Sequence, residues 1–144
     1  MDRKSRIEFL VDHVKNPRHQ GVLDGADVVL AGGSPECGGS VVIYLRGNEA
    51  GEIDAVSFTG EGDTLSMAGS SMILEKVTRE ALTPAEILAL DYDAFVDSVG
   101  RDLVGSRTRN VTLGLSTLKS AARKYQRDLL QGGSSADQSV AEIA

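Results

Sequence analysis

Cys37 is the only cysteine of the chain and lies in a glycine-rich stretch, Gly32-Gly33-Ser34-Pro35-Glu36-Cys37-Gly38-Gly39. The chemistry that such a residue can perform starts from its thiolate, which is the nucleophilic and metal-binding form of cysteine. Glycines on both sides remove Cβ atoms that would shield the sulfur, and they allow turns with positive φ. The stretch therefore predicts a thiol that a large partner can reach. An inert, buried cysteine is the alternative.

Two apolar runs flank this stretch and indicate strands. Val28-Val29-Leu30 is ended by Gly32-Gly33, and Ser40 to Leu45 is rich in β-branched residues. A turn cluster at 47–51 precedes a third apolar run. We expect a three-stranded antiparallel sheet with strands near 27–31, 40–46 and 52–58, in which the Cys37 loop joins the first two strands.

Helical patterns surround the expected sheet. Near the N-terminus, an apolar face with helical spacing ends before Asn16-Pro17; its members are Ile7, Leu10, Val11 and Val14. A second helix follows residue 63, with Asp63 or Thr64 as its cap. Thr83-Pro84-Ala85-Glu86 predicts a helix start, a short helix covers 92–99, and the last helix spans 111–130. The order predicts an α+β fold, a three-stranded antiparallel sheet with helices packed on one face.

Composition excludes several classes of protein. The 144 residues are 41% hydrophobic and carry a formal net charge of −6, without a basic patch, so we expect no nucleic-acid partner. No apolar run approaches the roughly 18 residues of a membrane span, so we expect no membrane partner. One cysteine cannot form an intrachain disulfide, and the charged N-terminus does not resemble a signal peptide. These features predict a cytoplasmic protein with one domain over 1–131 and a disordered tail over 132–144.

Four blocks of the sequence resemble one known family. The stretch from Asp12 to Leu23, DHVKNPRHQGVL, is similar to the DHYxNPRNxGxL signature of the IscU/SufU/NifU N-terminal family of iron–sulfur scaffold proteins. Pro35-Glu36-Cys37-Gly38 resembles the P-x-C-G-D loop of that family. The stretch from Phe58 to Ala68 resembles F-x-G-x-G-C-x-I-S-x-A, and the stretch from Arg107 to Leu113 resembles R-x-K-C-A-x-L. The resemblance implies an IscU/NifU-like sandwich and a role in iron–sulfur cluster assembly.

The chain departs from the family at the site. The family places three cysteines and an aspartate at one end of the sheet, and only Cys37 keeps its type here. Gly39 replaces the aspartate, Asp63 the second cysteine and Asn110 the third, while Arg109 stands where IscU-type members have a histidine. Iron–sulfur clusters and structural zinc prefer a closed shell of thiolate or imidazole donors. The resemblance makes a cluster or zinc conceivable, with Cys37 and Asp63 as the residues that could hold it, but we expect no tightly bound cofactor.

Other residues near the site carry alternatives. Asp63 is as well suited to capping a helix as to binding a metal, and Asn110 is better suited to a cap or turn before the last helix than to a ligand. His13 and His19 favour structural hydrogen bonds. Arg107 and Arg109 could favour the Cys37 thiolate, whereas Glu36 opposes it.

Two functions follow from the resemblance. In this family the equivalent loop receives persulfide sulfur from a pyridoxal-phosphate (PLP)-dependent cysteine desulfurase, a step that requires only an accessible thiolate. The first hypothesis is therefore a sulfurtransferase-like carrier that accepts sulfur on Cys37, in a loop with Gly38 and Gly39, and passes it to a downstream sulfur or cluster acceptor protein. The second is a non-catalytic pseudo-scaffold that binds and regulates a desulfurase or another assembly partner. An ordinary scaffold, in which two chains pool their thiolates, ranks third.

Overall fold

The structure is a computed structural model that describes residues 1–34, 36 and 38–132. The predicted tail, residues 132–144, lies outside this part except for Gly132. The elements are α1 (Arg3–Lys15), β1 (Val28–Ser34), β2 (Gly39–Gly47), β3 (Ile53–Gly62), α2 (Thr64–Glu80), α3 (Pro84–Leu88), α4 (Tyr92–Val99), α5 (Arg101–Val104), α6 (Thr108–Val111) and α7 (Leu113–Leu130). None of the helices in these residues is long and apolar enough to cross a membrane.

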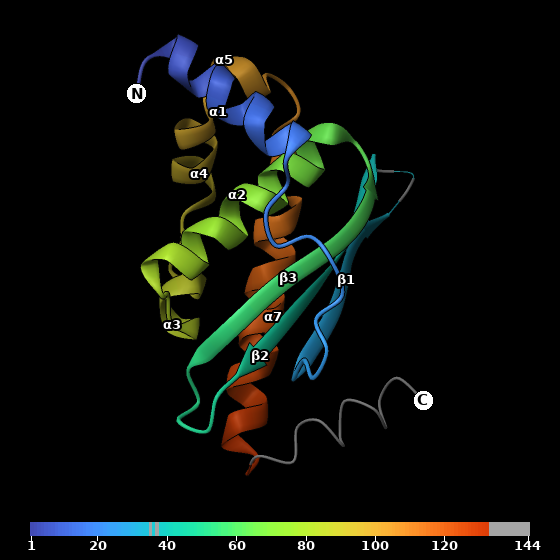
Figure 1. Ribbon diagram of the computed structural model, residues 1–144, viewed down its shortest axis with the longest axis vertical. Helices are drawn as coiled ribbons and strands as arrows, with labels where there is room; N and C mark the ends of the chain where they lie inside the picture. The colour runs from blue at the N-terminus through green and yellow to red at the C-terminus, as the bar shows by residue number, and fades with distance from the viewer. Residues whose placement is uncertain (35, 37, 133–144) are drawn as a thin grey trace.

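The three strands form one antiparallel sheet in the order β1-β2-β3. Figure 1 shows α7 behind this sheet and α2 beside β3, and both helices contact the sheet. Along β2 the buried side chains alternate, since Val41, Ile43 and Leu45 face the helices while the residues between them are half-buried. This is the period of two expected for a strand with one covered face. The α+β prediction is confirmed.

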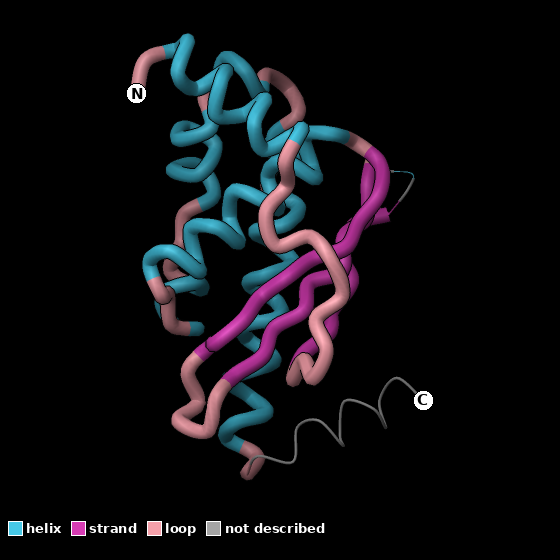
Figure 2. The backbone as a smooth tube through the Cα atoms, in the orientation of Figure 1, coloured by secondary structure: helices cyan, strands magenta, loops and turns pink. Residues whose placement is uncertain are grey.

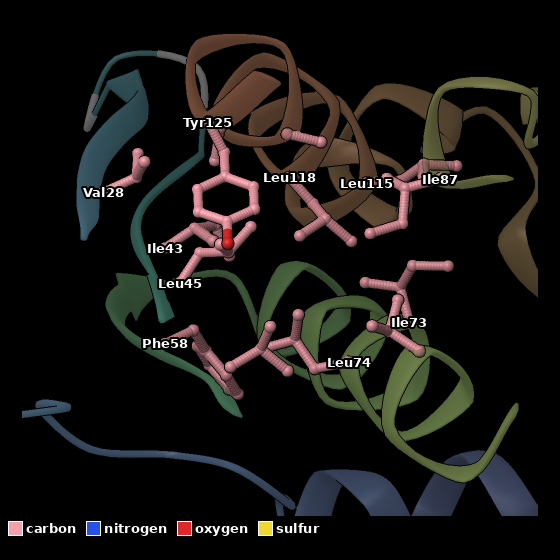
Figure 3. Packing of buried hydrophobic residues seen from close by; sticks show 14 residues of the cluster. Val28, Ile43, Leu45, Phe58, Ile73, Leu74, Ile87, Leu115, Leu118 and Tyr125 are labelled. Atoms are coloured by element: carbon pink, nitrogen blue, oxygen red, sulfur yellow. The ribbon is translucent and has the colours of Figure 1, made fainter. Parts of the chain in front are cut away.

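The main core lies between the sheet, α2 and α7. Phe58 of β3, Leu74 of α2 and Leu118 of α7 are fully buried, and Figure 3 shows their side chains with Tyr125 directed toward one another. Side chains of this size, buried completely, each contribute about 1.5–3 kcal/mol through removal of apolar surface from water. The core therefore rests on contacts between the sheet and these two long helices.

The strands are longer than predicted and run past their glycines. Gly32 pairs with Val41, and Gly33 with Ser40, so β1 does not end at the Gly-Gly pair. A Cβ atom on Gly32 would lie 2.0 Å from Oγ1 of Thr117 in α7. Glycine is required at this position by close helix–sheet packing rather than by a turn, a distinction that composition cannot make.

The buried face of α1 differs from the predicted one. Val11 and Val14 are exposed, and His13 is the only buried residue of α1. His13 Nδ1 lies 2.7 Å from Oγ of Ser71 in α2, and the Arg18 amide donates to the same oxygen at 2.7 Å. His13 therefore points inward, toward α2. The structural role predicted for His13 is thus seen directly.

The segment after α1 crosses the sheet and covers the middle of β3, as the loop in Figure 2 shows. The Phe58 amide donates to the His19 carbonyl at 2.8 Å, and the Gly21 amide donates to the Phe58 carbonyl at 2.7 Å. His19 adopts φ 62°, and its Nε2 lies 3.1 Å from Glu75 Oε1. The NPRH stretch therefore fastens the N-terminal segment to the edge of the sheet.

The helix starts agree closely with the sequence. Thr83 and Glu86 form a complete capping box at α3, and α4 spans Tyr92–Val99 as predicted. The last helix, α7, begins two residues later than predicted, because Val111 belongs to the preceding short helix α6.

We expect stability to fall in mild acid because of His13. Burial lowers the pKa of His13, Arg18 lowers it further, and Asp12 and Glu75 oppose this. At pH values between the ordinary histidine pKa of about 6.5 and the lower pKa of His13 in the folded chain, the imidazole binds a proton in the unfolded chain but not in the folded chain. The free energy of unfolding should therefore decrease as pH falls below about 6.5, by at most about 1.4 kcal/mol per pH unit. Urea unfolding at several pH values measures this slope, which His13→Gln should abolish and the control His19→Gln should retain.

Candidate functional site

The site is built where the β1–β2 turn meets the junction between β3 and α2. Gly39 pairs with Gly62, and the Asp63 amide donates to the Gly38 carbonyl at 2.7 Å. Gly62 has φ +113°, and a Cβ atom there would lie 2.7 Å from the Gly38 carbonyl oxygen. Only glycine allows this approach. The residue after Cys37 is thus held directly against the start of α2.

Asp63 is the N-cap of α2, as the sequence predicts. Its Oδ1 accepts hydrogen bonds from the amides of Leu65 at 2.8 Å and Ser66 at 3.3 Å. Its Oδ2 forms an ion pair with the Arg107 guanidinium. The Asp63 side chain is only 15% exposed. Both carboxylate oxygens are therefore already bound by groups of the protein.

Asn110 lies in α6 and is not the cap of the last helix, which is Thr112. The prediction of a cap or turn is therefore wrong. The reason is that the chain forms a separate short helix here. A Cβ atom on Gly38 would lie 2.8 Å from Nδ2 of Asn110. The Asn110 amide is thus directed at the Cys37 loop.

The two arginines lie in different surroundings. Arg107 precedes α6, is 51% exposed and reaches Asp63. Arg109 lies in α6 and is exposed.

Cys37 lies outside the described residues. Among the predicted site residues, the structure brings together Gly38, Gly39, Asp63, Arg107 and Asn110.

A shallow pocket of about 220 Å³ opens at this corner. It is lined by Gly38, Gly39, Ser40, Glu61 and Gly62. Three of these five residues have no side chain, so the walls are largely backbone. The corner can therefore admit a group from a partner molecule.

Sequence reasoning missed Ser66. Its hydroxyl is buried, has no hydrogen-bond partner among the described residues, and lies 3.3 Å from the place of a Cβ atom on Gly39. The spacing could have indicated it, since the third residue after an N-cap lies in the first turn of the helix, above the cap. An aspartate at position 39 would offer this hydroxyl an acceptor.

The donors at this corner do not fit a zinc ion or an iron–sulfur cluster. Zinc and clusters require thiolates, imidazoles or free carboxylates in a closed shell. Here the Asp63 carboxylate is bound by two amides and a guanidinium, Gly39 has no donor, and Asn110 offers a neutral amide. Within residues 1–34, 36 and 38–132, no group of three or more histidine, cysteine, aspartate or glutamate side chains could hold a metal ion.

Comparison with known proteins agrees with the fold. An iron–sulfur cluster assembly scaffold protein IscU of Thermotoga maritima is 31% identical over 113 residues, which cover 78% of this chain and 77% of that protein. The zinc-dependent sulfurtransferase SufU of Bacillus subtilis is 31% identical over 70 residues, 49% of this chain and 46% of that protein. The N-terminal part of a NifU-like protein from Brucella abortus has the same fold, with a TM-score of 0.67 at 20% identity over 83% of this chain and 93% of that one.

The family comparison covers almost the whole described chain. The NifU-like N terminal domain family matches residues 7–131, from α1 to the end of α7. The match includes every residue of the corner described above. The chain therefore belongs to the NifU-like N terminal domain family.

Proposed function

We propose that this protein is a metal-independent sulfur carrier of iron–sulfur cluster assembly, in which Cys37 accepts sulfur from a cysteine desulfurase in the cytoplasm. The main support is the state of Asp63, whose carboxylate is bound by the protein itself and is not available to a metal. Relatives named as an iron–sulfur cluster assembly scaffold and as a zinc-dependent sulfurtransferase support a role in this process. The thiol is then the remaining reactive group of the family's site.

The proposed step needs no metal or redox partner. The Cys37 thiolate attacks the outer sulfur of the persulfide on a PLP-dependent desulfurase. A new S–S bond forms at Cys37, the S–S bond of the donor breaks, and the desulfurase cysteine leaves as a thiolate. The transferred sulfur keeps its oxidation state and its proton. A downstream acceptor protein takes the sulfur by the same exchange.

The test is a transfer reaction followed by peptide mass spectrometry. The full chain, treated with a chelator, is incubated with its cognate desulfurase and cysteine. We expect one added sulfur atom on the peptide that contains Cys37, and its removal by a thiol reductant. Cys37→Ser should accept none, whereas the control Glu36→Gln, which changes only the exposed neighbouring charge, should accept sulfur.

The second candidate is a pseudo-scaffold that regulates its partner without chemistry. It is favoured by the loss of donors at positions 39, 63 and 110, which leaves the fold intact. If Cys37→Ser binds the desulfurase and changes its turnover as the unmodified chain does, with no sulfur added to either, the carrier proposal is rejected. A requirement for zinc in sulfur uptake would reject its metal-free form.

A further inference from the structure

The connection between α5 and α6, residues 105–107, is held to its neighbouring turns by backbone hydrogen bonds, from the Gly105 amide to the Arg101 carbonyl at 2.9 Å and from the Arg107 amide to the Val104 carbonyl at 3.1 Å. The Arg107–Asp63 ion pair joins it to the start of α2. Val104 before it and Val111 after it are buried, whereas Gly105, Ser106 and Arg107 are exposed. Gly105 has φ +58°, and no atom would lie within 4 Å of a Cβ atom there. The segment is therefore anchored at its two ends and crosses the surface between them.

The end of α6 is fixed tightly against α2. A Cβ atom on Gly69 of α2 would lie 2.2 Å from the Val111 carbonyl oxygen, so the backbones of α2 and α6 are in direct contact. Four residues earlier, the Arg107 side chain reaches the start of α2 through Asp63. Asn110 lies between these two attachments and faces Gly38. Its position therefore depends on both of them.

We propose that Arg107 serves as the internal cation of this corner, a positioning residue that replaces the bridging role of a metal. Its guanidinium joins the α5–α6 connection to the α2 cap and thereby holds Asn110 against the Cys37 loop. The same contact occupies Asp63 Oδ2 and keeps external cations away from it. This inference holds whether or not Cys37 accepts sulfur.

The physical basis is the geometry of the pair. A carboxylate that is 15% exposed and also accepts two amide hydrogen bonds is fixed in direction, so a guanidinium that binds it is fixed too. Exposed ion pairs contribute little to global stability, and Arg107 is half exposed. The expected consequence is local order rather than a large change in the free energy of unfolding.

Amide hydrogen exchange of the full chain measures this order. In Arg107→Gln we expect exchange of the hydrogen-bonded amides of Gly105, Arg107 (now Gln) and Val111 to become about ten-fold faster, without change in the core strand β2. Asp63→Asn keeps an acceptor for the α2 amides and should have the same effect. The double variant should add nothing further, and Arg107→Lys should restore part of the protection.

A matched control is Arg46→Gln, which removes an exposed Arg–Asp pair of 2.9 Å at the other end of the sheet. It should leave exchange of the Gly105, Arg107 and Val111 amides unchanged. Unchanged exchange in Arg107→Gln would overturn the proposal. An equal effect of Arg109→Gln would also overturn it, because the cause would then be the charge of the segment and not the pair.

Binding of manganese ion alone provides a second measurement. If Arg107 had only a structural role, its substitution would not change manganese binding. With Oδ2 of Asp63 released, paramagnetic broadening of the Gly38, Asp63 and Asn110 amide signals should begin in Arg107→Gln at a concentration about ten-fold lower than in the unmodified chain. Broadening at equal concentrations in both proteins would show that Arg107 does not exclude cations, and the proposal would fail.

Discussion

The triple variant Gly39→Asp, Asp63→Cys and Asn110→Cys is expected to bind one zinc ion per chain, whereas the unmodified chain binds none at micromolar concentrations. The reason is that positions 38, 39, 63 and 110 meet at one corner, through the Asp63–Gly38 hydrogen bond and the approach of Asn110 to Gly38. With Cys37, the variant would offer three thiolates and one carboxylate. Structural zinc sites of this kind contribute about 10–16 kcal/mol of binding free energy, which corresponds to dissociation constants from roughly tens of nanomolar down to picomolar.

The structure also predicts how the variant behaves without zinc. Asp63→Cys removes the cap of α2 and the partner of Arg107, so the free energy of unfolding should fall by about 1 kcal/mol or more. Aspartate fits at position 39 with small adjustments, since its Cβ would lie 3.3 Å from Ser66 Oγ and from the Glu61 carbonyl oxygen. Added zinc should then raise the melting temperature by on the order of 10 °C.

Zinc titration with competition by a chromophoric chelator measures the affinity. The same variant with Asn110→Ser in place of Asn110→Cys lacks one thiolate and serves as the control, which should bind far more weakly. A triple variant that folds but remains zinc-free would show that these positions do not share a coordination sphere. Stoichiometric zinc in the unmodified chain would contradict the metal-free carrier.

Gly69→Ala is expected to lower the free energy of unfolding by about 2–3 kcal/mol, although alanine normally stabilises a helix by about 1 kcal/mol relative to glycine. The added methyl group would lie 2.2 Å from the Val111 carbonyl oxygen and 3.3 Å from the Val111 Cα. Backbone atoms cannot rotate away as a side chain can, so α6 must move as a unit. Because α6 carries Asn110, the amide signals of Gly38 should shift as well.

Urea unfolding monitored by circular dichroism tests the sign of this change. Gly39→Ala is the matched control, because the same methyl group there meets its nearest neighbours at 3.3 Å, and it should cost less than about 1 kcal/mol. A Gly69→Ala variant as stable as the unmodified chain would mean that α2 and α6 are not in backbone contact in solution.

The sequence predicted the helices and strands well because the residues that start and end them are close together in the chain. The capping box at Thr83 and Glu86 and the cap at Asp63 lie within four residues of the groups that they bind, and both were predicted. The resemblance also placed positions 39, 63 and 110 at one end of the sheet, where the structure brings them together.

The sequence analysis missed features that depend on contacts between segments far apart in the chain. His13 is buried because Ser71, 58 residues away, provides a polar partner, and an apolar periodicity cannot indicate that. Gly32 continues β1 because Thr117 packs against it, not because the chain turns. The ion pair between Asp63 and Arg107 joins residues that no local pattern relates. The roles of Cys37 and of Arg109 in sulfur transfer stay predictions.

The two edges of the sheet differ in a way that bears on aggregation. Backbone groups in the middle of β3 are already bonded to His19 and Gly21, whereas no described segment pairs with the outer edge of β1, and Val28–Ser34 contains no charged residue. Uncharged open edges are templates for strand pairing between molecules. Such pairing at high concentration should therefore begin at β1. A symmetric antiparallel pair uses the open edge of both chains, so growth by this route favours closed dimers over fibres.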